Sequence, residues 1–270
     1  MLVIIKGAGD LASGIAYRLN KSNFEVIMTD IANPTSIRNT VSFNQAIIDK
    51  ETTIDGVKAV LAKSNIDALE ISKAGNIAVL VDESAECVKE LRPYVLVDAI
   101  LAKKNLGTTI DDATIVIGVG PGFNATVDCN AVVETLRGHN LGRVIYNGEA
   151  AKNTNVPGLI GGFSGERIIR ATDDGIFHPI KGIGDFVTEG DVVAYVDEEP
   201  VKCNLTGVIR GMLRDGIKVK KGMKSGDVDP RGELSYCYTP SDKALAVAGG
   251  VLEAILHFSG VNNEWWYKTY

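Results

Sequence analysis

The sequence has few of the residues that build zinc sites or disulfide frameworks. Its 270 residues include four cysteines and three histidines, and no two cysteines have the Cys-x-x-Cys spacing. Without paired or clustered thiols, we expect neither a metal site nor a disulfide framework. An ordinary hydrophobic core therefore has to hold the fold together, and the chain is long enough to bury one.

Long apolar runs and an excess of positive charge are missing as well. No stretch approaches about 18 consecutive apolar residues, the length of a membrane-spanning helix. The short apolar run after Met1 has neither a basic leader nor a cleavage site. We therefore expect a cytoplasmic protein with no membrane partner. The 28 basic and 34 acidic side chains give a net charge of −6, so nucleic acid is not an expected partner either.

Glycine is abundant, at 29 residues, and the first 120 residues follow a regular alternation. Short runs rich in Val and Ile alternate with amphipathic stretches, which is typical of βαβ units. The expected strands are 2–6, 25–30, 57–61, 76–81, 94–98 and 114–119, the expected helices are 11–21, 65–73 and 84–91, and two further β-like runs lie near 130–136 and 143–147. This pattern predicts an α/β fold with a Rossmann-like parallel sheet.

A glycine-rich turn links the first expected strand to the first expected helix. The segment Gly7-Ala8-Gly9-Asp10-Leu11-Ala12 has the Gly-x-Gly-x-x-Ala pattern in the setting where it indicates a dinucleotide site. Gly7 would make the turn, Gly9 would admit a pyrophosphate, and Ala12 would let helix and strand pack closely. Asp30, at the end of the second strand, would accept hydrogen bonds from ribose hydroxyls and would repel the 2′-phosphate of NADP.

Two charged residues near this turn leave alternatives open. The carboxylate of Asp10 repels pyrophosphate unless it points away as a helix-starting residue, and it could instead contact a metal or substrate. Arg38 could reach a nucleotide base or a phosphate, or pair with a surface carboxylate.

Further candidates lie in later loops. Gly118, Gly120 and Gly122 stand at the carboxyl end of an expected strand, where open α/β sheets place their ligand crevice, so we expect them to line the same cleft. Lys103 and His139 are the candidate acid/base residues. Histidine is the usual proton-transfer group near neutral pH, and His139 lies in a polar, glycine-rich loop; a packed or capping histidine is the alternative.

An internal repeat begins after residue 165. The positions Gly175, Gly184, Val187 and Gly190 recur 32 residues later as Gly207, Gly216, Val219 and Gly222. The segment 184–194 resembles the first half of a biotinyl/lipoyl-like barrel-sandwich domain, and the repeat supplies the second half. The connection 197–204 lacks the carrier-type sequence around Lys202, which favours an unmodified structural or docking module. We interpret Asp227-Val228-Asp229 as a surface turn, with a cation site as the alternative.

These observations divide the chain into three ranges. Residues 1–165 form the expected nucleotide-binding domain, 166–240 the β module, and 241–270 a closing helix with an aromatic tail. Ser241 is the expected N-cap of that helix, which runs to about residue 257 and covers one of the two domains. The tail residues Trp265, Trp266 and Tyr267 serve as packing anchors or as part of a homodimer interface.

Several long segments together resemble the YqeB family, accessory proteins of selenium-dependent molybdenum hydroxylase systems. These segments are 5–12, 98–109, 120–123, 134–143, 226–232 and 241–244. The resemblance implies a role in maturing a molybdenum hydroxylase, with that enzyme or its maturation machinery as partner. The first part also resembles the Rossmann half of the xanthine dehydrogenase accessory proteins, which implies molybdopterin dinucleotide as a ligand. Where the family has a histidine after Gly-Pro-Gly-Phe, this chain has Asp128-Cys129-Asn130, so that role is missing, has moved to Cys129, or Cys129 is a buried inert thiol.

Three hypotheses follow. The leading one is an accessory protein that binds a nucleotide-bearing cofactor, either molybdopterin dinucleotide or NAD, and that needs no turnover. The second is an NAD-dependent oxidoreductase that uses Lys103 or His139 as acid/base group. The third is a scaffold that has kept the Rossmann shell without a ligand.

Overall fold

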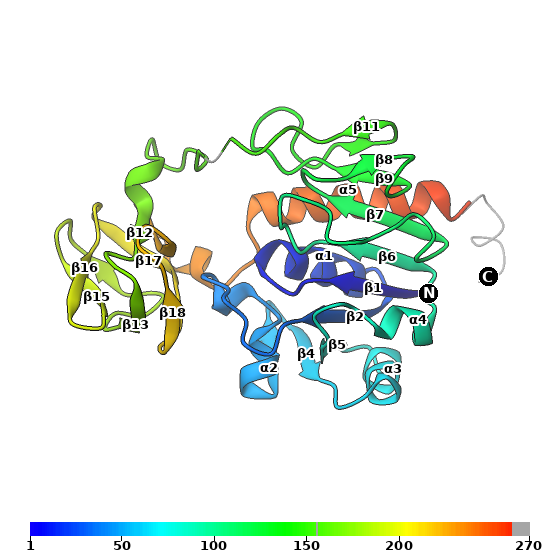
Figure 1. Cartoon of the computed structure of the whole chain (residues 1–270), viewed down its shortest axis with the longest axis horizontal. Helices are drawn as coiled ribbons and strands as arrows, with labels where there is room; N and C mark the ends of the chain where they lie inside the picture. The colour runs from blue at the N-terminus through cyan, green and yellow to red at the C-terminus, as the bar shows by residue number, and fades with distance from the viewer. Residues whose placement is uncertain (155, 261–270) are drawn as a thin grey trace. The chain divides into compact units, whose positions relative to one another are not determined.

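The computed structural model describes residues 1–154 and 156–260, which divide into two compact units (Figure 1). Of the described residues, the first unit contains 1–32, 43–153 and 241–260, and the second contains 33–42, 154 and 156–240. From the sequence we expected residues 33–42 to belong to the first domain, whereas the structure assigns them to the second unit. The tail residues Trp265, Trp266 and Tyr267 lie outside the described residues.

The first unit is built on a large, mostly parallel sheet. Its strands are β1 (Leu2–Lys6), β2 (Glu25–Asp30), β3 (Glu51–Ile54), β4 (Val57–Leu61), β5 (Ile77–Val81), β6 (Val95–Asp98), β7 (Ile115–Val119), β9 (Ala131–Val133) and β10 (Val144–Ile145). They lie in the order β10-β9-β7-β6-β1-β2-β5-β4-β3. The edge strands β3 and β10 are antiparallel to their neighbours, and the strands between β9 and β4 are parallel. The chain therefore leaves β1 toward β2 and later returns to add β6 on the other side of β1.

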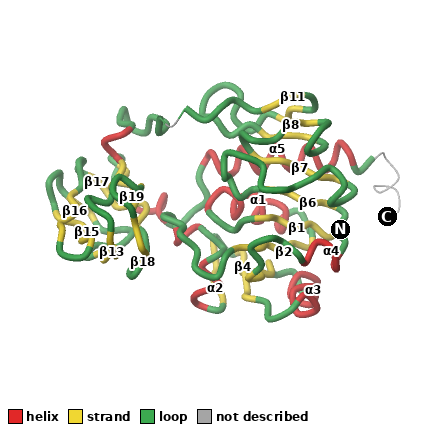
Figure 2. The backbone as a smooth tube through the Cα atoms, in the orientation of Figure 1, coloured by secondary structure: helices red, strands yellow, loops and turns green. Residues whose placement is uncertain are grey.

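Helices cover both faces of this sheet, as Figure 2 shows in red. They are α1 (Asp10–Lys21), α2 (Gln45–Asp49), α3 (Asn65–Lys73), α4 (Cys87–Leu91) and α5 (Asp242–Phe258). Because successive strand residues point to opposite faces, Ile4, Ile27 and Leu96 share one face, where they form a core cluster with residues of α3 and α4. A short two-stranded ladder of β8 (Asn124–Ala125) and β11 (Gly148–Glu149) lies outside the main sheet.

The closing helix α5 packs against α1. Ser241 is its N-cap and accepts a hydrogen bond from the backbone N–H of Ala244 at 3.1 Å, so the predicted cap is confirmed. A side chain at Gly14 of α1 would come within 2.6 Å of the Ala244 Cβ, so the two helices approach closely. Both helices begin at the end of the sheet where the parallel strands finish (Figure 1). Among the described residues, no helix has the length and apolar character needed to cross a membrane.

The second unit consists mainly of two four-stranded antiparallel sheets. Its strands are β12 (Ile168–Arg170), β13 (Gly175–Pro179), β14 (Phe186–Val187), β15 (Val192–Val196), β16 (Glu199–Lys202), β17 (Gly207–Met212), β18 (Ile217–Val219) and β19 (Lys224–Asp229). One sheet has the order β12-β19-β17-β14 and the other β16-β15-β13-β18. Each strand of the first sheet has a counterpart in the second sheet that lies 32 residues earlier or later in the chain, in the same order. The sequence repeat therefore corresponds to two equivalent half-units. They enclose one core cluster around Phe177.

The segment 33–42 belongs to this second unit although it directly follows β2. The backbone N–H of Met212 donates to the carbonyl of Ile37 at 2.8 Å, and the hydroxyl of Thr40 donates to the carbonyl of Cys237 at 2.6 Å. Three short 3-10 helices, Asn39–Val41, Gly165–Arg167 and Leu234–Cys237, complete the unit.

Candidate functional site

The turn between β1 and α1 requires glycine at its first position. Gly7 has φ +92°, a conformation that L side chains rarely adopt, and its N–H donates to the carbonyl of Thr29 at 2.9 Å. A Cβ here would lie 2.9 Å from the carbonyl oxygen of Ala99, on the loop after β6. The turn is therefore held between the ends of β2 and β6, beside the point where the strand order reverses.

Asp30, the last residue of β2, holds this turn in place. Its Oδ2 accepts hydrogen bonds from the backbone N–H of Ala8 at 3.0 Å and from the Asn44 side chain at 2.9 Å. Its Oδ1 accepts from the backbone N–H of Ile31 at 2.8 Å. A carboxylate offers about four acceptor positions, and donors among the described residues take three of those of Asp30, so one remains on Oδ1 for a ligand hydroxyl. Asn44 was not among the residues predicted from the sequence.

The remaining residues of the glycine motif belong to the start of α1. Leu11 and Ala12 are buried, so their side chains serve packing. The Oδ1 of Asp10 accepts from the backbone N–H of Leu11 at 2.9 Å, which favours its interpretation as a helix-starting residue. Lys243, in the first turn of α5, lies near this carboxylate. Burial lowers the pKa of Lys243, and the negative charge of Asp10 opposes that shift.

A buried charged network joins the ends of β1 and β6. The Lys6 ammonium donates to the hydroxyl of Thr108 at 2.7 Å and lies 3.5 Å from Oδ2 of Asp98. The Thr108 hydroxyl in turn donates to that Oδ2 at 2.6 Å. All three residues are less than a tenth exposed. Sequence reasoning did not select Lys6 or Thr108 as site residues. The available signal was that two neighbouring parallel strands each end in a charged residue, Lys6 in β1 and Asp98 in β6.

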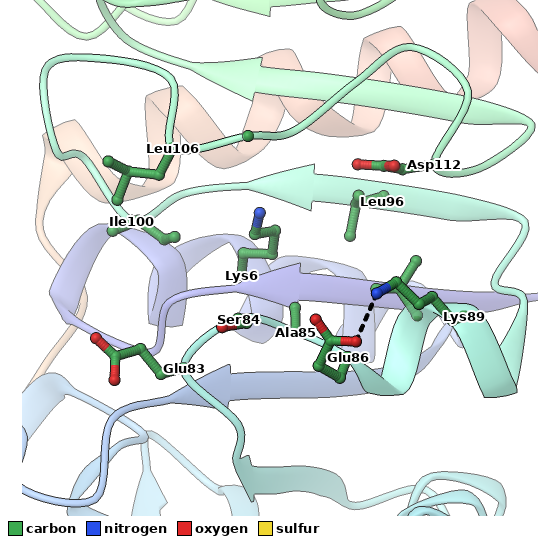
Figure 3. Close-up of a pocket in the computed structure, with 12 residues that line it drawn as sticks. Lys6, Glu83, Ser84, Ala85, Glu86, Lys89, Leu96, Ile100, Leu106 and Asp112 are labelled. Atoms are coloured by element: carbon green, nitrogen blue, oxygen red, sulfur yellow. Dashed lines mark hydrogen bonds and ion pairs between the residues drawn. The ribbon is translucent and has the colours of Figure 1, made fainter.

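A cavity of about 430 Å³ opens beside this network. Figure 3 shows Lys6 rising from β1 between the loop that leads into α4 and the loop that follows β6. The lining residues are Lys6, Glu83, Ser84, Ala85, Glu86, Val88, Lys89, Leu96, Ile100, Leu106, Gly107 and Asp112. The helix α4 is only five residues long, and this cavity lies at the sheet face next to it.

The second glycine cluster packs against the chain itself. A Cβ at Gly118 would overlap the ring of Phe123, and one at Gly122 would lie 2.6 Å from the Lys104 Cα. Gly120 and Gly122 also have positive φ, at +80° and +111°. These contacts give each glycine a packing role, and the expectation that the cluster lines a ligand cleft stays a prediction.

The other predicted residues lie on separate segments. Lys103 is exposed on the loop after β6 with φ +64°, and His139 is exposed on the loop between β9 and β10. Neither residue lines the cavity. Arg38 lies in the second unit, where its guanidinium donates to the carbonyl of Tyr236 at 3.0 Å.

Cys129 stands where the resemblance led us to expect a histidine. Its side chain is fully buried, and this burial raises the pKa of the thiol to about 11. A thiol that stays protonated at neutral pH is a poor ligand or base. The structure therefore favours the interpretation of Cys129 as an inert core residue.

The acidic segment 227–229 is not the surface turn that the sequence suggested. Asp227 and Asp229 lie in β19 and are buried. Asp227 pairs with Arg167 at 2.7 Å, and Asp229 pairs with Arg231 at 2.6 Å and with Arg210 at 3.4 Å. Arginine partners thus take the carboxylate oxygens that a cation would need. In residues 1–154 and 156–260, no group of three or more acidic, Cys or His side chains is arranged to hold a metal ion.

Comparison with known proteins gives one strong match. The chain is 51% identical over 255 residues to an Escherichia coli K12 protein described as uncharacterized protein YqeB. The match covers 94% of this chain and 47% of that protein, so the chain spans about half the length of the curated relative it matches. This similarity supports the resemblance to the YqeB family. No family model matches the chain.

Solved structures resemble the chain only weakly. An aspartoacylase family protein from Mesorhizobium loti matches with a TM-score of 0.26 and 10% identity over 84% of this chain and 83% of its own. The ectoine utilization protein EutE from Ruegeria pomeroyi matches with a TM-score of 0.23 and 13% identity over 84% and 57% of the two chains. Scores of this size carry no argument about function.

Proposed function

We propose that this chain, a relative of YqeB over 94% of its length, is an accessory protein for the maturation of a molybdenum hydroxylase that binds a nucleotide-bearing cofactor. The proposed ligand is molybdopterin dinucleotide or NAD, and the proposed site is a Rossmann-like cleft at the carboxyl end of β1. Selenium dependence of the hydroxylase enters through the family resemblance alone. The proposal concerns the part of the family protein that this chain covers.

The observation that carries the binding proposal is the turn after β1 and its support by Asp30. The parallel strands β5, β2, β1, β6, β7 and β9 lie in the order of a doubly wound dinucleotide-binding sheet. The glycine turn lies at the reversal of that order, where such sheets bind ligands. Asp30 fits a ribose less fully than a free carboxylate would, since Ala8, Asn44 and Ile31 already use three of its acceptor positions.

The second unit supports a docking role. Its two equivalent half-units fit a biotinyl/lipoyl-like barrel-sandwich module, in which carrier members have their modified lysine on a hairpin between the halves. The turn between β15 and β16 is Asp197-Glu198, and Lys202 lies within β16. We therefore propose an unmodified module that docks on the hydroxylase or on its maturation machinery.

Thermal unfolding with candidate ligands tests the binding proposal. At ten times its Kd, a ligand of the folded state should add about 1.4 kcal/mol to the free energy of unfolding. We expect this gain with molybdopterin cytosine dinucleotide, NAD or ADP, and a smaller gain with NADP. Asp30→Asn should reduce the gain because the turn loses its anchor, whereas Glu70→Gln, on the exposed side of α3, should not. Equal gains in both variants would contradict the assignment of the site, and no gain with any of these ligands would favour a scaffold without a ligand.

Deleting the gene tests the maturation role. The activity of the cell's molybdenum hydroxylase should fall several-fold, while the amount of hydroxylase polypeptide stays the same, because the enzyme would be made without its complete cofactor. Measuring activity and bound cofactor in the purified hydroxylase checks this. Unchanged activity in the deletion strain would count against the role, and re-expression of the full-length gene is the control.

A further inference from the structure

The cavity beside α4 is distinct from the glycine turn, although both lie at the end of β1. Lys6, the last residue of β1, contributes to the cavity, and Gly7 begins the turn. Lys6 lies two residues after Ile4 in β1, so its side chain points to the same sheet face, the one that α3 and α4 cover. A volume of about 430 Å³ lies within the range of small-molecule sites.

The floor of the cavity offers one hydrogen-bond donor. The Lys6 ammonium has three N–H groups, of which one donates to Thr108 and a second faces Asp98. No acceptor in the part of the chain that the structure describes takes the third, so it is available to an acceptor atom in the cavity, beside which Figure 3 shows the ammonium. Because Asp98 already balances the charge of Lys6, this donor favours a neutral acceptor such as a ring carbonyl and has no excess charge for a phosphate.

The rim of the cavity carries acceptors. Glu86 pairs with Lys89 at 2.6 Å, and Asp112 accepts hydrogen bonds from the backbone and hydroxyl of Thr109. Glu83 is exposed, and its carboxylate has no hydrogen bond or ion pair among the described residues. At the rim, the carboxylates of Glu83, Glu86 and Asp112 outnumber the single ammonium of Lys89. This excess of negative charge repels anionic ligands and attracts N–H donors.

The walls between floor and rim are apolar. Ala85 and Leu96 are buried, whereas Ile100 and Leu106, which lie beside Lys6 (Figure 3), are 36% and 52% exposed. Such walls fit the faces of a flat ring, while the polar groups at the two ends fix its orientation.

We propose that this cavity binds the neutral lactam ring of a heterocycle such as pterin or guanine, with the ring carbonyl on Lys6 and the ring N–H and amino groups on Glu83. The proposal rests on the proposed function and deepens its molybdopterin alternative, because neither ring system of NAD is a lactam: the pterin ring would lie here and the pyrophosphate at the glycine turn. The ring itself carries no phosphate, so its binding can be measured without the rest of the cofactor.

Titration of the purified full chain with free pterin, followed by pterin fluorescence, tests the proposal, and calorimetry with guanosine separates the two ring types. Lys6→Met and Glu83→Gln should each raise the Kd at least tenfold, and Glu70→Gln should leave it unchanged. If Lys6→Met fails to fold, Glu83→Gln carries the test, because the Glu83 side chain is exposed and has no partner within residues 1–154 and 156–260. Failure of both rings to bind, or binding that neither variant weakens, would overturn the proposal.

A parallel titration with ADP keeps the two proposals apart. ADP binding without ring binding would refute the lactam site and leave the glycine turn as a nucleotide site. Ring binding without ADP binding would support the lactam site and refute the nucleotide-binding part of the proposed function.

Discussion

Gly250→Ala should lower the free energy of unfolding by about 2–3 kcal/mol, although alanine is the better helix former. Gly250 lies in the middle of α5, and a Cβ there would overlap the carbonyl oxygen of Gly142 and approach the Val133 side chain to 2.8 Å. The turn that carries Gly142 is itself fixed, because its N–H donates to the carbonyl of Glu134 at 2.9 Å. Backbone that is held in this way cannot move aside cheaply, so the overlap strains both α5 and the turn.

The neighbouring glycine provides a matched control. A Cβ at Gly249 would meet nothing within 4 Å, so Gly249→Ala should raise the free energy of unfolding by about 0.5–1 kcal/mol through helix propensity alone. Urea denaturation of the two variants and the unmodified chain measures both effects. A stabilising effect of Gly250→Ala would show that the turn does not pack against α5 in solution.

The regular elements of the first unit could be predicted because their signals are local. Short apolar runs rich in Val and Ile predicted β1, β2, β4, β5, β6 and β7 within a residue or so, and the helical spacing predicted α3 at its observed bounds. The predicted N-cap at Ser241 located the start of α5. The hairpin between β3 and β4 was missed, although Asp55-Gly56, with both φ values positive, is a strong two-residue turn signal.

Contacts between distant segments could not be predicted in the same way. Nothing in the sequence near Gly250 points to Gly142, and nothing near residues 33–42 indicates that this segment joins the second unit. Such contacts depend on shape and on the path of the chain, which leave no periodic pattern. The glycines at 118 and 122 illustrate the same limit, because a pattern typical of ligand loops also arises where the chain needs room for Phe123 and Lys104.

For the candidate site, the sequence located the turn and Asp30 but missed the network at the cavity. The Gly-x-Gly-x-x-Ala pattern is local, whereas Lys6, Asp98 and Thr108 come together only because β6 lies next to β1. The sequence showed that each of these strands ends in a charged residue, but periodicity does not give the order of the strands, so it did not show that Lys6 and Asp98 are paired. The buried pair Asp227 and Asp229 was misplaced for a related reason, since Arg231 is near Asp229 in the sequence but Arg167 and Arg210 are distant from the carboxylates that they contact.

The buried carboxylate of Asp229 should be the most sensitive polar position in the second unit. It is 1% exposed and accepts hydrogen bonds from the Arg231 guanidinium at 2.9 and 2.6 Å, while Arg210, itself buried, lies 3.4 Å away. Asp229→Asn would leave the positive charge of Arg210 buried without its partner. Removing one member of a buried pair costs about 3–5 kcal/mol, so we expect a loss of this size at pH 7. Glu198→Gln, on the exposed turn between β15 and β16, should change the free energy of unfolding by less than about 0.5 kcal/mol.

The dependence on pH separates this charge effect from a general packing defect. Burial alone would raise the pKa of Asp229, but the hydrogen bonds and positive charge of Arg231, together with Arg210, outweigh it and lower the pKa below its ordinary value. A carboxyl group with a lowered pKa stabilises the fold above its ordinary pKa of about 3.9, and this contribution is lost as the pH falls through the lowered value. The difference in unfolding free energy between the unmodified chain and Asp229→Asn should therefore be largest at pH 5–7 and shrink as the pH falls below about 4. Denaturation at a series of pH values measures it, and a difference that stays constant down to the lowest pH would show that the ion pairs of Asp229 do not stabilise the unit.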